Sequence, residues 1–326
     1  MNRVVDSDVA PTSLRMTDER PVTPGLHRPV LVEAALAHLA PKPGMRVVDA
    51  TAGMGGHSLA LLPKLLPDGS LIAIDRDTQA LDLARRRLVE FSERIEFVHG
   101  NFRDLPDILE NLGVAKIDAL LLDLGMSSFQ VDSAGRGFSF LKDGPLDMRM
   151  DATQDFSARE LVNTWRPEDL LNLLWKLGEE RFASSIVRRV VEARRRRPIE
   201  TTAELASIIA AAVPPKARYG RLHPATRTFQ AIRMAVNDEL GAIEQILESF
   251  RPCMNPGARA VVITFHSLED RLVKHAFRAG ALQGFWKVLT KKPVTPEDEE
   301  IQNNARARSA KLRAIEILAE PSENMN

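Results

Sequence analysis

The chain has 326 residues, of which 44% are hydrophobic and 27% charged, the ordinary balance of a folded globular protein. Its 44 Lys and Arg residues balance 44 Asp and Glu residues, which excludes a globally basic surface, so nucleic-acid binding would need a local patch. A single cysteine, Cys253, excludes an internal disulfide and a multi-cysteine zinc site. We expect this thiol to pack in the core, and we expect no bound metal.

No apolar run approaches the length that spans a bilayer, and residues 1–25 lack the apolar segment of a secretion signal. We therefore expect a cytoplasmic protein without a membrane partner. Residues 1–25 mix acidic and basic side chains, and we expect them to form a disordered tail.

Short apolar segments alternate with helical patterns, which is typical of a parallel sheet with helices on both faces. Strands are predicted near 46–49, 71–75, 95–98, 117–123 and 259–265. Four strands end in, or are followed at once by, an ionisable residue: Asp49, Asp75, Asp123 and His266. Ligands bind at the carboxyl ends of such strands, so we expect these side chains to line one rim. The alternative for each aspartate is a turn-forming role.

The first strand runs into a glycine-rich loop. A dinucleotide-binding loop follows G-x-G-x-x-G/A, and from Gly53 this chain has Gly55 and Gly56 but Ser58 in place of the last small residue. Asp49 at the strand end favours a ligand with an ammonium or sulfonium group over a pyrophosphate. The loop therefore favours S-adenosylmethionine as the cofactor. NAD, and a strand-helix turn without a ligand, are the alternatives.

The alternation of strands and helices stops after Asp123. Between Gly125 and about Thr226 the chain has a loop rich in Gly, Ser and Asp and then helical periodicity, with an apolar stripe over 179–197. One long helix is predicted from about Pro224 through Leu247, ahead of the last strand.

These patterns predict an α/β fold: a doubly wound, mostly parallel Rossmann-like sheet with an inserted all-helical domain. The core is discontinuous and comprises residues 26–128 and 224–326. The insertion comprises residues 129–223, and we expect it to recognise RNA.

The insertion and the segment after it carry a local positive charge. Between Ile186 and Arg227 there are ten basic and three acidic residues, a net charge of plus seven in a neutral protein. Such a cluster suits phosphate groups, and its densest run is Arg194, Arg195, Arg196 and Arg197. The alternative is a solvated helix face.

Several longer segments resemble the MraW/RsmH family over about His27 to Leu318. Among them are Gly55-Gly-His-Ser58, Leu122-Asp-Leu-Gly-Met-Ser-Ser128, Asp143-Gly-Pro-Leu-Asp-Met-Arg-Met150, Gly178-Glu-Glu-Arg-Phe182, His223-Pro-Ala-Thr-Arg-Thr-Phe-Gln230 and Phe265-His-Ser-Leu-Glu-Asp-Arg271. Members of this family are S-adenosylmethionine-dependent methyltransferases of the Rossmann-like class I. They modify N4 of a cytidine in the decoding centre of bacterial 16S ribosomal RNA.

The resemblance implies 16S rRNA within the small ribosomal subunit as the partner, and no DNA. The family's cofactor contacts correspond here to Gly55, Gly56, His57, Asp75, Phe102, Asp123 and Gln130. The chief departures from the family are Ala50-Thr-Ala-Gly-Met54 and a short segment between Gly280 and Glu300, and neither removes a contact residue.

Physical roles can be assigned to most of these residues. The amides of Gly55, Gly56 and His57 are expected to face the methionine carboxylate at the positive end of a helix. Asp75 lies 22 residues after Gly53, the spacing at which a carboxylate meets ribose hydroxyls. Phe102 follows the third strand and is expected to lie against adenine; a core position is the alternative.

Methyl transfer is an in-line displacement, so catalysis depends mostly on alignment. The cytosine amine is a weak nucleophile, and an acceptor for its N–H would help it to pyramidalise. We hypothesise that Asp123, or a main-chain carbonyl just after it, is this acceptor. The base must be unpaired or flipped, since pairing hides N4.

The remaining candidates for contact with RNA each have a structural alternative. Asp147 and Arg149 either position the base or its phosphate, or pair with each other. Arg227 either meets a phosphate or is structural, and His223 either contacts RNA or caps a helix. His266 lies at the rim, and Ser267 is predicted to cap the following helix. A non-catalytic RNA-binding protein is the alternative for the chain as a whole.

Overall fold

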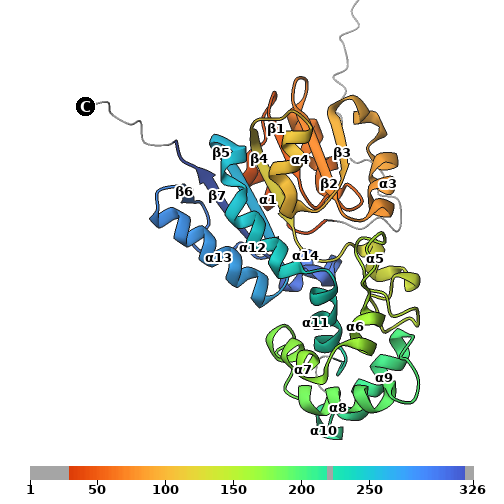
Figure 1. Ribbon diagram of the computed structural model, residues 1–326. Coiled ribbons are helices and arrows are strands. Elements are labelled where there is room, and N and C mark those ends of the chain that lie inside the picture. Colours follow the sequence, from red (N-terminus) through yellow and green to blue (C-terminus); the bar gives the residue numbers. More distant parts are fainter. Residues whose placement is uncertain (1–28, 219–222, 320–326) are drawn as a thin grey trace, which may run out of the picture.

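The computed structural model describes residues 29–218 and 223–319 (Figure 1). The tail predicted over residues 1–25 lies outside the described residues. Within those two ranges, no helix is long and apolar enough to cross a membrane.

The described residues form one seven-stranded sheet in the order β3-β2-β1-β4-β5-β7-β6. The strands are β1 (Arg46–Asp49), β2 (Ser70–Asp75), β3 (Ile95–His99), β4 (Ile117–Asp123), β5 (Met254–Thr264), β6 (Trp286–Val288) and β7 (Lys311–Ile317). The first five are parallel, and β7 runs antiparallel to β5 and β6. The predicted mostly parallel α/β fold is confirmed, and β6 and β7 are additions that the sequence analysis did not predict.

Helices cover both faces of this sheet (Figure 1). One face packs against α1 (Val32–Leu39), α2 (Gly56–Leu65) and α3 (Thr78–Arg87). The other packs against α4 (Leu105–Asn111), α12 (Glu239–Ser249) and α13 (Ser267–Leu282). Leu120, Leu121 and Leu122 of β4 are all buried, as expected for a strand covered on both sides. Short helices complete this part: η1 (Val89–Arg94), η2 (Phe102–Asp104), η4 (Arg251–Cys253), α14 (Asp298–Asn303) and η5 (Ala305–Ser309).

The segment between β4 and β5 forms a separate helical region with its own hydrophobic cluster, below the sheet in Figure 1. Its elements are α5 (Ser128–Asp132), η3 (Ala134–Arg136), α6 (Ala158–Thr164), α7 (Pro167–Lys176), α8 (Ala183–Arg194), α9 (Thr202–Ala212), α10 (Pro215–Arg218) and α11 (Thr226–Val236). Helix α8 covers most of the apolar stripe seen in the sequence. Its inward side chains Ile186, Val187 and Val190 are buried.

The single helix predicted over 224–247 is wrong, because the chain breaks between α11 and α12. Asn237 ends α11 and is buried: its Nδ2 donates to the carbonyl oxygen of Met148, and its Oδ1 accepts from the amide of Met150. Asp238 then has a left-handed φ of 45°. Tertiary hydrogen bonds to a distant loop therefore stop a helix that local periodicity alone would continue.

Candidate active site

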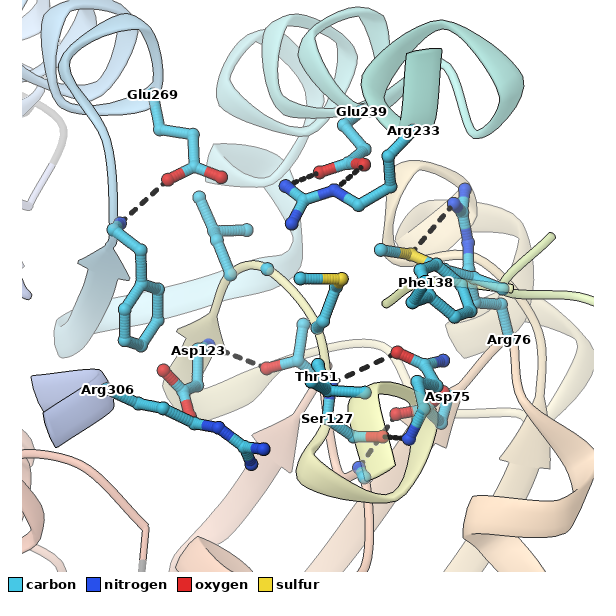
Figure 2. Close-up of a pocket in the computed structure, with 18 of the residues that line it drawn as sticks. Thr51, Asp75, Arg76, Asp123, Ser127, Phe138, Arg233, Glu239, Glu269 and Arg306 are labelled. Carbon is cyan, nitrogen blue, oxygen red and sulfur yellow. Dashed lines mark hydrogen bonds and ion pairs between the residues drawn. The ribbon is translucent and has the colours of Figure 1, made fainter. Parts of the chain in front are cut away.

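A cavity of about 510 Å³ lies at the carboxyl ends of β1, β2, β4 and β5 (Figure 2). Three of the four predicted rim residues line it: Asp75, Asp123 and His266. Helix α11 contributes to the wall through Thr226, Phe229, Gln230 and Arg233, which share one helical face. The cavity therefore lies between the sheet and the helical region.

Asp49 does not line the cavity, so its predicted place on the rim is wrong. The side chain is fully buried, and its Oδ2 accepts a hydrogen bond from Ser58 Oγ at 2.7 Å. Its Oδ1 accepts from the amide of Thr51 at 3.4 Å. Burial raises the pKa of Asp49, and this effect outweighs the opposing effect of nearby His57. Asp49 thus ties the start of α2 to the end of β1 instead of facing a ligand.

The glycine loop ends in a tight entry to α2. Gly55 has a φ of +76°, and a Cβ there would lie 2.9 Å from a methyl carbon of Leu88. Its amide donates to the carbonyl oxygen of Ala52 at 2.8 Å. This N–H therefore has a partner within the protein, whereas we expected it to face the cofactor. Gly56 and His57 form the first turn of α2, where N–H groups have no intrahelical acceptor. These two amides are the ones placed to bind an anionic group.

His57 and Asp123 form a polar pair in the cavity wall. The imidazole Nε2 lies 3.4 Å from Asp123 Oδ2. The Asp123 amide donates to Thr51 Oγ1 at 2.6 Å (Figure 2). Among the described residues, the buried Asp123 Oδ1 and His57 Nε2 have no hydrogen-bond partner. Burial lowers the pKa of His57, but the carboxylates of Asp123 and Asp49 outweigh it, so the net shift is upward. The rim thus keeps one free acceptor, Asp123 Oδ1, beside an imidazole whose Nε2 has only the long contact with Asp123 Oδ2.

Asp75 organises the loop from the end of β2. Its Oδ2 accepts from the Gly53 amide at 2.7 Å, and its Oδ1 accepts from the Asp77 amide at 2.8 Å. Each carboxylate oxygen retains a second lone pair for a ligand hydroxyl. Burial raises the pKa of Asp75 to about 6, although both amide hydrogen bonds oppose the shift.

Phe102 and Gln130 both line the cavity, in different ways. Phe102 begins η2 and forms an apolar part of the wall together with Ala242 and Ile243 of α12, as a ring-binding slot requires. Gln130 is buried and largely occupied within the protein. Its Oε1 accepts from the Ser127 amide, and its Nε2 donates to Asp77 Oδ2 at 2.9 Å.

The structure pairs most of the predicted RNA contacts internally. Arg149 Nε donates to Asp147 Oδ1 at 2.7 Å. These two residues thus pair with each other, which was the structural alternative to contact with RNA. Arg227 Nη1 donates to the carbonyl oxygen of Glu179 at 2.7 Å. His223 Nδ1 accepts from the Ala225 amide, and the imidazole ring stacks 4.7 Å from that of Phe140.

The run of four arginines is also mostly engaged. Arg194 donates to the carbonyl oxygens of Val162 and Trp165, both at 2.6 Å, and so closes the end of α6. Arg196 pairs with Glu192 and Arg197 pairs with Glu204. The side chain of Arg195 is exposed and makes no hydrogen bond or ion pair with another described residue.

The cap of α13 is displaced by one residue from the prediction. His266, not Ser267, is the N-cap, and its Nδ1 accepts from the Glu269 amide at 3.4 Å. Glu269 returns the interaction by accepting from the amides of Phe265 and His266. His266 Nε2 lies 3.0 Å from Glu269 Oε1. The rim histidine is therefore a helix cap whose ring also borders the cavity.

The sequence analysis missed a buried ion pair in the cavity wall. Arg233 donates to both carboxylate oxygens of Glu239 at 2.7 Å, across the break between α11 and α12 (Figure 2). Burial lowers the pKa of Arg233, but Glu239 outweighs it and the net shift is upward. The one sequence signal was an arginine on the otherwise apolar side of a helical pattern.

The sheet order, the antiparallel β7 and the cavity at the strand ends define a protein of the Rossmann-like class, in which a cofactor binds at the carboxyl ends of the strands. The model of the MraW methylase family matches residues 25–318, and the chain belongs to this family. The predicted cofactor and the predicted family are thereby confirmed.

Similar proteins named ribosomal RNA small subunit methyltransferase H occur in several bacteria. The one from Nitratidesulfovibrio vulgaris is 50% identical, over 90% of this chain and 86% of the relative. The one from Nostoc sp. is 47% identical, over 97% of this chain and 100% of the relative. The one from Geobacter sulfurreducens is 48% identical, over 90% of this chain and 99% of the relative.

Proposed function

We propose that the protein methylates N4 of a decoding-centre cytidine in 16S rRNA, within the small ribosomal subunit. The names of its relatives support a substrate in small-subunit rRNA. The observation that carries the assignment to an amine is the buried Asp123 Oδ1, which lies in the cavity wall without a partner among the described residues. A free carboxylate acceptor suits an exocyclic amine, whose N–H groups need a partner once they leave water.

The residues of the cavity fit S-adenosylmethionine. Asp75 offers spare lone pairs for ribose hydroxyls, Gly56 and His57 offer amides for a carboxylate, and Phe102 offers an apolar wall for adenine. The cofactor supplies, when bound, a methyl group on a sulfonium centre. The spare acceptor of Asp123 lies on the same wall.

In the proposed mechanism, Asp123 acts on the amine. Its carboxylate accepts an N–H of N4, draws the lone pair out of conjugation with the ring and fixes its direction. The N4–carbon bond forms as the sulfur–carbon bond breaks, and the amine proton leaves toward Asp123. Thr51 holds the Asp123 backbone, and His57 holds one carboxylate oxygen. Such alignment is where most of the rate enhancement originates.

The cavity wall suits an unpaired base. Phe140, Phe229 and Phe265 line it, and their rings provide apolar surfaces for a flipped nucleobase. The charged wall of Arg233, Glu239 and Glu269 provides donors and acceptors beyond the cofactor-binding residues (Figure 2).

We also propose the division into a core of residues 26–128 and 224–326 and a helical insertion of 129–223. The separate hydrophobic cluster of the helical region supports this division. Helix α11 packs into that cluster and lines the cavity, so it joins the two parts.

The decisive experiment supplies methyl-labelled S-adenosylmethionine together with small subunits or naked 16S rRNA, followed by nucleoside analysis. We expect labelled N4-methylcytidine. Label on another nucleoside, on protein or on a small molecule would contradict the proposal. RNA binding without any transfer would favour the non-catalytic alternative.

A further inference from the structure

Helix α13 is strongly two-sided. Its inward side chains Val273 and Phe277 are buried under the sheet, and the Trp286 Nε1 donates to the Phe277 carbonyl oxygen. Gly280 leaves room for the Trp286 ring, which a Cβ would meet at 2.0 Å. The helix is thus fixed against β6 and cannot turn its outer face inward.

Four basic side chains lie on an outer face of α13: Arg271, Lys274, His275 and Arg278. Their spacing of three, one and three residues places them on one face, about 10 Å from end to end. All four are exposed. None of them makes an ion pair or hydrogen bond with another described residue. We call these four residues the α13 basic face.

The acids of α13 do not offset this charge. Glu269 caps the helix, and Asp270 is buried, with its Oδ1 2.7 Å from Arg313 Nε and its Oδ2 3.1 Å from Lys311 Nζ. After them, residues 271–292 contain six Lys and Arg residues and no Asp or Glu. In a chain of zero net charge, such a segment is a local concentration of positive charge.

The α13 basic face begins beside the cavity. Phe265, His266 and Glu269 all line the cavity, and Arg271 follows Glu269 by two residues, about 3 Å along the helix axis. From there helix α13 leads away from the rim, along the outside of the sheet domain (Figure 1). Two residues also turn the helix by about 200°, so the face starts close to the cavity but on the side of α13 that points away from Glu269. The strand that flanks a nucleotide in the cavity would meet this charge where it passes over the outer side of α13.

We propose that the α13 basic face binds the phosphate backbone of the RNA that flanks the target nucleotide. This rests on the proposed function, because it takes the substrate to be RNA. Unpaired lysines and arginines bind phosphates without reading sequence, so the face would hold the strand while the cavity selects the base. On this side of α13 the large exposed apolar side chain is Leu282, at the far end of the helix, and a single leucine does not make the apolar face of a membrane-binding helix.

The test compares two triple variants with equal loss of charge. The first is Arg271→Gln, Lys274→Gln and Arg278→Gln. The control is Lys42→Gln, Lys64→Gln and Arg94→Gln, which are likewise exposed and unpaired among the described residues. Lys42 and Arg94 precede β1 and β3, and Lys64 is in the last turn of α2, so all three lie at the opposite ends of the strands from the cavity.

For each variant, KM for small subunits, affinity for a naked 16S rRNA fragment by filter binding, and cofactor affinity would be measured at several salt concentrations. We expect the α13 triple to raise KM and the RNA dissociation constant at least tenfold. Its log–log salt slope should fall by about two, because each lost phosphate contact removes roughly 0.7 to 0.9. Cofactor affinity should stay the same, and the control triple should change RNA binding less than threefold.

The outcomes separate this proposal from the proposed function. Equal effects of both triples would show a general charge effect and overturn the α13 basic face. A loss confined to intact subunits, with naked RNA bound normally, would overturn it in favour of a ribosomal protein partner. RNA affinity that depends on α13 in a protein that transfers no methyl group would support the face and overturn the proposed reaction. If the α13 triple variant binds RNA normally and the protein transfers methyl groups to rRNA, the α13 basic face is overturned and the proposed reaction is supported.

Discussion

At the cavity rim, polar atoms are buried without partners, whereas in the helical insertion the charged side chains are largely paired. Asp123 Oδ1 is enclosed by protein and lacks a hydrogen bond among the described residues, and the neighbouring His57 Nε2 has only the 3.4 Å contact with Asp123 Oδ2. Arg194, Arg196 and Arg197 are nearer to solvent, yet each is bound to a carbonyl or a carboxylate. A buried unpaired polar group costs free energy, so its retention indicates a ligand.

Judged by charge density alone, the insertion would be expected to bind a ligand before the cavity rim would. The insertion segment carries a net charge of plus seven, but several of its guanidinium groups hold the helices together. A binding site is therefore better identified by buried polar groups that the fold leaves without a hydrogen-bond partner than by charge density.

The largest effect is expected for Asp123→Asn. The amide keeps the size of the side chain but loses the charge that accepts from the amine, so kcat should fall about 100-fold, the low end for a positioned proton acceptor. Single-turnover transfer to rRNA and calorimetric cofactor affinity would be measured together. Near-normal turnover with unchanged cofactor affinity would rule out the proposed role.

Asp75→Asn should weaken cofactor binding by about 30- to 100-fold, since hydrogen bonds to a charged acceptor are worth about 2 to 3 kcal/mol. Titration calorimetry with S-adenosylmethionine measures this directly. Asp82→Asn, an exposed carboxylate on α3, is the matched control and should change nothing. Equal affinities for wild type and Asp75→Asn would place the ribose elsewhere.

Arg194→Ala should destabilise the protein by about 2 kcal/mol, because two charge-assisted hydrogen bonds at the end of α6 are lost. Urea unfolding would show this loss, while KM for small subunits should stay within threefold. Arg195→Ala, with no described partner, should cost less than about 0.5 kcal/mol. A raised KM without any loss of stability would instead make Arg194 an RNA contact.

Cofactor affinity should decrease as the pH falls through about 6, because protonated Asp75 accepts ribose hydroxyls poorly. The effect on stability has the opposite sign. The pKa of Asp75 is raised by folding, so its contribution is full below its ordinary value of 3.8 and is lost as the pH rises through about 6. Calorimetry between pH 5 and pH 7.5 checks the first trend, and in Asp75→Asn this pH dependence should be absent.

The smallest effect is expected for neutralising the exposed, unpaired charges of the insertion. The variant Arg188→Gln, Arg195→Gln and Lys216→Gln should change KM for small subunits less than threefold. A tenfold increase in this KM, equal to that expected for the α13 triple, would show that the insertion binds RNA after all.

The parts of the fold that follow from local pattern could be predicted from the sequence. Strands β1 to β5 are apolar runs, and Asp75 and Asp123 at their ends line the cavity as expected. The burial of Asp49 could not be predicted, because it depends on Ser58 reaching back from α2. Strand β6 has three residues, too few for a periodic signal.

Long-range contacts account for the other differences. The break at Asn237 is set by the carbonyl of Met148 and the amide of Met150, both far away in sequence. The α13 basic face is visible as a spacing in the sequence. Its significance depends on the position of α13 beside the cavity and on the inward use of Glu269 and Asp270, which only the fold shows.

Helix α11 belongs to two bodies at once. Phe229 is part of the hydrophobic cluster of the insertion and also borders the cavity, and Arg233 fixes the next helix through Glu239. Cavity and insertion are therefore physically connected through α11. A base that tightens the packing of α11 against the insertion would, by reciprocity, bind more weakly when a substitution loosens that same packing, by the same coupling free energy.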